Sequence, residues 1–189
     1  SYLGLRARGG EKCLETLTDT LVQATGLSSS RKRTSVAHVD IMNGGQNNLI
    51  SSVEINMSGR LLAAAGVTKR IKIFDLETLL SAREVGADED ANFHFPLLEI
   101  PTVFKLSCVS WCRDRAPILA AADFSGAVTV YNTDVNTRLQ SYTEHTARAW
   151  SVDFSTEQPN LMVSGSDDKF IKLWDVGRMS QSALSLAST

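Results

Sequence analysis

The acidic and histidine side chains are the residues of this chain that could do acid–base chemistry. Asp167 and Asp168 stand next to each other and could act as a general acid and a general base. The histidines His38, His94 and His145 are far apart, and the sequence has no Gly-x-Ser-x-Gly, Gly-x-x-x-x-Gly-Lys or His-Glu-x-x-His pattern. We therefore predict that the chain is not an enzyme and that the Asp167-Asp168 pair is structural.

Two of the cysteines, Cys108 and Cys112, have a spacing that could begin a metal site. Structural zinc takes four ligands, usually as two pairs, and no second Cys or His pair accompanies these two. We expect both thiols to be reduced and to behave as small apolar side chains in or beside a strand. The sequence therefore predicts neither a metal nor another cofactor.

The composition is that of an ordinary globular protein. The chain has 189 residues, of which 43% are hydrophobic and 21% charged, and its net charge is −2. No basic excess points to nucleic acid as a partner. No apolar run approaches the roughly 20 residues of a membrane span, so we expect no membrane partner either.

One pattern recurs three times from residue 49 onward and would position these side chains. Each unit has an alternating strand, a turn, a strand of small residues, a tight turn and a strand that closes on an aromatic residue. The predicted units are residues 49–76, 105–132 and 145–175, closing on Phe74, Tyr131 and Trp174. The last interval is near the roughly 40–45 residues of one propeller blade. The first is longer because of an acidic insertion at 81–95, which we place in a loop between blades.

The third unit contains four polar groups that can satisfy one another. His145 opens the unit, Ser164 lies in a middle strand, Asp168 in the tight turn, and Trp174 closes the next strand. A neutral imidazole can bridge the serine and the aspartate while the indole N–H donates to the serine. With its Trp174-Asp175 ending, this structural tetrad is the signature of a WD repeat, one four-stranded blade of a β-propeller. The matching positions in the other units retain less: Ala121, Ser125 and Tyr131 in the second, Thr68 and Phe74 in the first.

The predicted fold is all-β, with about three WD-repeat blades of an expected seven. Three blades do not close a ring, so we expect either a part of a longer chain or a ring completed by another chain. Residues 1–47 are predicted as an N-terminal segment with a short helix and a basic linker. Residues 177–189 are predicted as a polar tail.

Lys105, Arg148 and Trp150 each lie near the start of a predicted strand. Strand starts and their loops line one rim of a propeller. Two cations beside an exposed aromatic suit the capture of an acidic, partly apolar peptide. A plainer interpretation is that Trp150 belongs to the core and that Arg148 is a solvated neighbour.

Several strings of the repeat region carry a more specific similarity: AAAGVTKRIKIFD (63–75), FPLLEI (95–100), KLSCVSW (105–111), AADFSGAVTVYN (121–132), EHTARAWSVDFS (144–155) and LMVSGSDDKFIKLW (161–174). They resemble the propeller of the COP/SPA proteins, the constitutively photomorphogenic ubiquitin ligase and the suppressors of phytochrome A. The resemblance implies a substrate receptor that binds acidic Val-Pro peptides of transcription factors or photoreceptors. It also implies other ligase subunits as partners, and a place in the nucleus and cytoplasm.

The resemblance also assigns site residues by local match. Lys105 and Arg148 would pair with peptide carboxylates, while Phe124 and Trp150 would wall an apolar slot. Residues 1–47 have no RING-type Cys/His spacing and the chain has no kinase motif, so we expect a non-catalytic binding module. The alternative is a WD-repeat scaffold that joins a larger assembly and has no peptide pocket of its own.

Overall fold

The computed structural model describes residues 49–81, 95–115, 117–177 and 181–187. These residues belong to one compact unit, Ala37–Thr189. The N-terminal segment predicted at 1–47, with its helix and basic linker, lies outside the described residues. So does most of the insertion predicted at 81–95.

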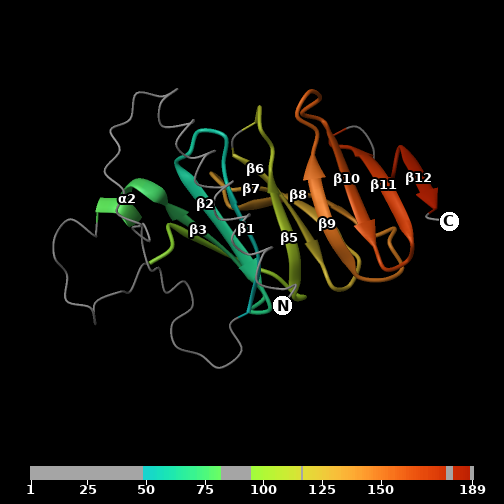
Figure 1. The fold of residues 1–189 in the computed structure, drawn as a ribbon, viewed down its shortest axis with the longest axis horizontal. Coiled ribbons are helices and arrows are strands. Elements are labelled where there is room, and N and C mark those ends of the chain that lie inside the picture. The colour runs from blue at the N-terminus through green and yellow to red at the C-terminus, as the bar shows by residue number, and fades with distance from the viewer. Residues whose placement is uncertain (1–48, 82–94, 116, 178–180, 188–189) are drawn as a thin grey trace, which may run out of the picture. The chain divides into compact units, whose positions relative to one another are not determined.

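The described residues form three four-stranded antiparallel sheets, which we call blades 1 to 3 (Figure 1). Blade 1 contains β1 (Ile50–Ile55), β2 (Leu61–Gly66), β3 (Arg70–Asp75) and β4 (Leu98–Pro101). Blade 2 contains β5 (Leu106–Trp111), β6 (Ile118–Asp123), β7 (Val128–Asn132) and β8 (Thr137–Tyr142). Blade 3 contains β9 (Ala149–Phe154), β10 (Leu161–Ser166), β11 (Phe170–Asp175) and β12 (Leu184–Ala187). The prediction of an all-β fold built from propeller blades is confirmed for the described residues.

The fourth strand of each blade comes from residues that follow a predicted unit. β4 and β8 lie in the connections between units, and β12 lies in the segment predicted as a polar tail. The expected place of the insertion also needs correction. It joins β3 to β4 inside blade 1, after the short helix α2 (Leu76–Ser81), instead of joining two blades.

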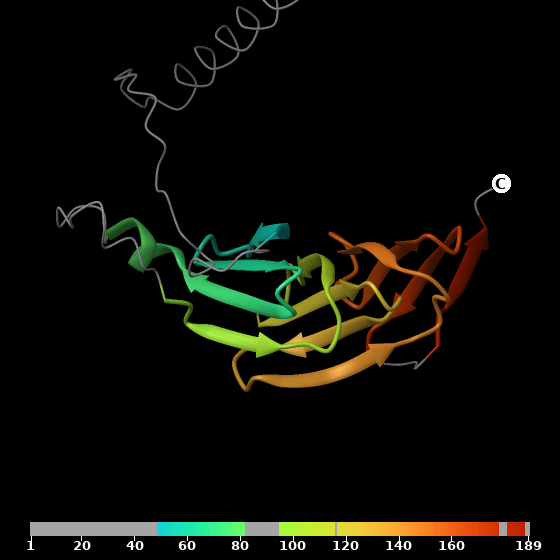
Figure 2. The same ribbon diagram turned by 90° about the horizontal axis from the view of Figure 1, so that it is seen from below.

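Neighbouring blades pack through apolar side chains that alternate along their strands. Between blades 1 and 2 the core contains Ile71 and Ile73 from β3 against Val109 and Trp111 from β5. Between blades 2 and 3, side chains of both sheets again form one cluster: Val128, Val130 and Tyr142 with Val152, Phe154, Met162 and Trp174. The first strands β1, β5 and β9 therefore lie next to each other, and Figure 2 shows the blades following in chain order.

Small residues in the second strands allow this close packing. Ala63, Ala64 and Ala65 of β2 are each at most 3% exposed, since both faces of the strand are covered. On the face of blade 1 away from blade 2, Leu79 of α2 packs against Ala64 and Phe74. In the described part of the chain, no helix has the length and apolar character needed to cross a membrane.

Candidate functional site

The rim at which each first strand begins is built in the same way in all three blades. The residue after the second strand donates its backbone N–H to the carbonyl of the residue before the first strand. These pairs are Val67 to Leu49 (3.0 Å), Phe124 to Lys105 (2.9 Å) and Asp167 to Arg148 (3.0 Å). Lys105 and Phe124 are thus partners on blade 2, and Arg148 occupies the position of Lys105 on blade 3.

A β-bulge follows at the start of each first strand, and its extra residue is Ser51, Ser107 or Trp150. The Ser51 hydroxyl donates to the Leu106 carbonyl at 2.7 Å, and the Ser107 hydroxyl donates to the Ala149 carbonyl. Each serine thereby joins its blade to the next. In blade 3 a tryptophan takes this place and is 47% exposed. The repeat does not require an aromatic residue here, so Trp150 is additional rim surface.

Trp150, Phe124 and Arg148 come together where blades 2 and 3 meet. The Trp150 and Phe124 ring centroids are 5.5 Å apart with the rings tilted by 58°. The guanidinium carbon of Arg148 lies 5.1 Å from the Trp150 ring centroid and 5.8 Å from that of Phe124. These are distances at which a cation is attracted to an aromatic face. Three of the four side chains assigned to the peptide site therefore form one cluster, and the exposed Lys105 adjoins it through its backbone.

Asp167 completes this group, although its place in the sequence predicts only a structural role. One of its carboxylate oxygens accepts the Nε–H of Arg148 at 3.0 Å, and the other accepts the indole N–H of Trp150 at 2.6 Å. The Arg148 and Asp167 side chains are 50% and 40% exposed, so their ion pair contributes little free energy. The Asp167 carboxylate nevertheless fixes the direction of the Arg148 and Trp150 side chains. We call Phe124, Arg148, Trp150 and Asp167 the rim cluster.

Arg148 retains donors for a ligand. A guanidinium has five N–H donors, and Asp167 accepts the one on Nε. Among the described residues, no acceptor lies within hydrogen-bond reach of its two Nη groups. The paired Nη edge can bind a carboxylate through two parallel hydrogen bonds. The rim cluster can therefore present a cation and two aromatic rings to one ligand.

The predicted tetrad lies directly below this rim and is joined by hydrogen bonds. His145 Nδ1 lies 2.8 Å from Asp168 Oδ2, and His145 Nε2 lies 2.8 Å from Ser164 Oγ. The indole N–H of Trp174 donates to the same Ser164 oxygen at 2.9 Å. The Ser164 hydroxyl is then free to donate to Nε2, which assigns the imidazole proton to Nδ1 and directs it at Asp168. All four polar groups are satisfied inside the blade.

Hydrogen bonds determine the charge state of Asp168. Burial acts to raise the pKa of this carboxyl, but the Phe170 backbone N–H, His145 and the Thr146 backbone N–H outweigh it, so the pKa lies below its usual range. The ionised Asp168 holds the turn that also carries Asp167. The tetrad therefore fixes the turn from which Asp167 contacts the other members of the rim cluster.

Two groups of residues with the types used in acid–base and nucleophilic catalysis are not arranged for it. The Asp167 carboxylate bonds to rim side chains, whereas that of Asp168 bonds to the buried tetrad, so the two do not act as an acid–base pair. Ser164, His145 and Asp168 have the residue types of a nucleophilic triad. However, Ser164 is 2% exposed and its oxygen already accepts the Trp174 N–H. A substrate could not reach it.

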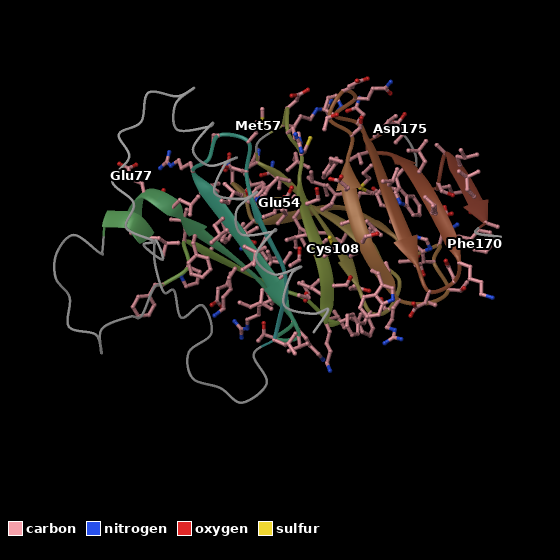
Figure 3. The ribbon with its side chains drawn as sticks, in the orientation of Figure 1. Glu54, Met57, Glu77, Cys108, Phe170 and Asp175 are labelled. Carbon is pink, nitrogen blue, oxygen red and sulfur yellow. The ribbon has the colours of Figure 1, made fainter. Side chains whose placement is uncertain are left out.

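Cys108 and Cys112 lie in or directly after the first strand of blade 2. Cys108 on β5, labelled in Figure 3, lies 3.9 Å from the Ser52 hydroxyl and 3.6 Å from the Val152 carbonyl. Cys108 and Cys112 are both free thiols. Over the ranges that the structure describes, no three His, Cys, Asp or Glu side chains are grouped so as to hold a metal ion.

Glu54, also labelled in Figure 3, joins two first strands. It accepts the backbone N–H of Trp111 at 2.7 Å, linking β1 to β5. Burial raises the pKa of the Glu54 carboxyl, and the negative charge of Asp153 acts in the same direction, while the Trp111 N–H opposes both. The raised pKa of Glu54 is therefore explained by its structural place in the contact between blades 1 and 2.

Comparison with known proteins agrees with the blade architecture. The family described as "WD domain, G-beta repeat" matches residues 136–175, which extend from β8 to β11. The sequence repeat thus begins with the outer strand of one blade and ends with the third strand of the next. Among solved structures, a chain of the "Crystal Structure of Mitotic Checkpoint Complex" matches with a TM-score of 0.59 and 18% identity, covering 72% of this chain and 36% of that one. The blades and the tetrad define a WD-repeat protein of the β-propeller class.

The sequence relatives are more specific. The "E3 ubiquitin-protein ligase COP1" of Pisum sativum is 37% identical over 169 residues, which are 89% of this chain and 24% of that protein. The "Protein SUPPRESSOR OF PHYA-105 1" of Arabidopsis thaliana is 37% identical over 137 residues, which are 72% of this chain and 12% of that protein. The chain belongs to the COP/SPA family of WD-repeat proteins. It spans about a quarter or less of the length of these curated relatives.

Proposed function

We propose that these blades are part of the substrate receptor of a COP/SPA-like ubiquitin ligase complex. They would bind short acidic peptides that carry a Val-Pro motif, from client proteins such as transcription factors or photoreceptors. The complex would mark these clients for degradation in the nucleus and cytoplasm, and this region would contribute binding without catalysis. The observation that carries the proposal is the rim cluster, in which Asp167 holds Arg148 and Trp150 beside Phe124.

The chemistry of the rim cluster suits such a peptide. The Nη edge of Arg148 and the exposed ammonium of Lys105 would take peptide carboxylates. Valine and proline side chains would pack against the tilted rings of Phe124 and Trp150. A rigid aromatic pair provides contact area at little cost in conformational entropy, and proline restricts the free peptide. Charge would therefore select the peptide and the rings would hold its apolar part.

Calorimetric titration of the chain with an acidic Val-Pro peptide tests the proposal. We expect Arg148→Glu or Lys105→Glu to weaken binding by roughly 1–3 kcal/mol, which is about 5- to 150-fold in Kd. Arg138→Glu is the matched control, since Arg138 is exposed on the outer strand β8 and undergoes the same change of charge. Equal affinity of the wild type and the Arg148→Glu/Lys105→Glu variant would contradict the proposal.

A second function has its own support on the face of blade 3 that points away from blade 2. Ala120, Val128 and Tyr142 of blade 2 are fully buried against blade 3. The residues at the matching positions of blade 3 are Val163, Ile171 and Leu186, which are 42%, 51% and 53% exposed. This face has the apolar chemistry of a contact between blades. It favours a scaffold that joins a larger assembly through a further blade, and in that case Trp150→Ala would leave assembly unchanged.

A further inference from the structure

The loop between blades 1 and 2 exposes two apolar side chains on the same rim. Val103 is 75% exposed and Phe104 is 48% exposed. They directly precede Lys105, whose carbonyl accepts the N–H of Phe124 in the rim cluster. A further apolar surface therefore adjoins the proposed peptide site along the chain itself.

Hydrogen bonds hold this loop in place. The Thr102 backbone N–H donates to the Lys69 carbonyl at 2.9 Å, and the Thr102 hydroxyl donates to the Phe104 carbonyl at 3.0 Å. The bond from Phe124 to the Lys105 carbonyl fixes the other end. Val103 and Phe104 are thus presented to solvent by an ordered backbone. Exposed apolar side chains that gather at one place often mark a binding surface.

Blade architecture does not account for this exposure. The loop between blades 2 and 3, residues 143–148, contains the buried His145 of the tetrad and no large apolar side chain. The loop between blades 1 and 2, residues 102–105, has no histidine and points its apolar residues outward instead. Two equivalent connections therefore differ in chemistry at the rim.

The charges around the loop indicate the kind of partner. Lys69 and Lys105 flank it, and both are exposed. Neither forms a salt bridge with another described residue, whereas nearby Arg70 is paired with Glu99 at 2.7 Å. The rim thus continues from blade 3 to blade 1 as apolar side chains beside cations. An acidic peptide with an apolar side chain complements this combination.

We propose that Val103 and Phe104 form a second apolar subsite of the rim, which takes a large apolar side chain of the bound peptide outside its Val-Pro motif. This inference rests on the proposed function, because the same acidic peptide occupies both subsites. Lys105 joins this loop to the rim cluster through its backbone, so an extended peptide, which advances about 3.3 Å per residue, can continue along the rim toward it. Client peptides are then distinguished by an apolar residue that flanks the motif.

A double-mutant cycle between peptide and protein tests the subsite. Acidic Val-Pro peptides, with either serine or leucine at successive flanking positions, are titrated into the wild type and into Val103→Ser/Phe104→Ser. At one flanking position we expect leucine to improve affinity about 5- to 20-fold in the wild type and to bring no gain in the variant. Val135→Ser is the matched control, because Val135 is 63% exposed in a loop away from this rim and its substitution should preserve the gain. Phe104→Leu should preserve most of the gain as well.

The other outcomes overturn the inference in distinguishable ways. Serine and leucine peptides that bind equally at every position, or a leucine gain that persists in Val103→Ser/Phe104→Ser, would remove the subsite and leave the rim cluster intact. If the wild type binds none of the peptides, the proposed function fails and the subsite fails with it. If sedimentation shows a dimer that the double substitution dissociates, the surface serves self-association instead.

Discussion

At the scale of single residues, one carboxylate directs two side chains of the rim cluster. Asp167 accepts N–H groups from Arg148 and Trp150 with separate oxygens. Removing the Asp167 carboxylate has two opposing effects on the affinity for an acidic ligand. The cation loses a nearby negative charge, which favours binding, but Arg148 and Trp150 lose their orientation, which disfavours it.

Asp167→Ala should separate these effects through salt. At high ionic strength the gain in attraction is screened, so the loss of orientation should dominate and lower peptide affinity by about 3- to 10-fold. At low salt the loss should be smaller. Titrations at both salt concentrations check this, with Asp134→Ala as a control because Asp134 is an exposed turn residue. Unchanged affinity at high salt would show that Asp167 does not position the site.

Asp168 should make the free energy of unfolding depend on pH in the acid range. Its pKa is lowered in the folded state, so its contribution is present above the ordinary Asp pKa of about 4 and is lost as pH falls through the lower folded value. We expect the difference in unfolding free energy between wild type and Asp168→Asn to be constant above about pH 5 and to shrink below pH 4. Urea unfolding across this range measures it, and a difference independent of pH would contradict the assignment.

At the scale of elements, the turn of blade 2 that carries Phe124 depends on a glycine. Gly126 has φ +95°, and a Cβ there would lie 2.5 Å from the Ala147 carbonyl oxygen and 2.7 Å from that of His145. These oxygens belong to the connection that leads to Arg148. A side chain at position 126 would therefore push the Phe124 turn away from the rest of the rim cluster.

Gly126→Ala should accordingly lower both stability, by about 1–3 kcal/mol, and peptide affinity. Gly59→Ala is a matched control, because Gly59 also has positive φ (+72°) but has nothing within 4 Å of its added Cβ. We expect the control to lose some stability and to keep its affinity. Urea unfolding and calorimetry distinguish the two effects, and normal affinity in Gly126→Ala would contradict this account of the turn.

The same scale explains which elements the sequence could predict. The first three strands of each blade alternate or carry small residues because they pack against a neighbouring blade. The outer strands lack this pattern: β12 is exposed along its whole length, and β8 begins with three exposed residues. The sequence therefore predicts a polar tail where β12 lies and a connection between blades where β4 lies.

The site divides in a similar way. Lys105, Arg148 and Trp150 could be predicted from their places at strand starts, and Phe124 from a local string that resembles a known family. Asp167 could not, since its bonds to Arg148 and Trp150 join residues of different strands. A usable signal was present in the repeat. Asp167 follows β10 as Phe124 follows β6, so the two occupy the same rim position.

At the scale of the whole molecule, the described blades follow one another in chain order, and the contacts between neighbouring blades repeat. Hydrogen bonds from Ser51 and Ser107 link each of the first two blades to the next, and an apolar cluster lies in each contact between blades. The rim cluster lies across the contact between blades 2 and 3, with Phe124 on blade 2 and the other members on blade 3. The proposed binding site therefore depends on the packing of two blades and is not a property of one repeat.

The central claim is that the rim cluster binds an acidic Val-Pro peptide, and tryptophan fluorescence tests it most directly. Trp150 is 47% exposed, whereas Trp111 and Trp174 are 2% and 0% exposed, so a ligand at the rim should alter the emission of Trp150 selectively. We expect the peptide to cause a saturable blue shift that is absent in Trp150→Phe and absent when alanines replace valine and proline in the peptide. Saturable binding by calorimetry with no change in emission, or an identical shift in Trp150→Phe, would contradict the account.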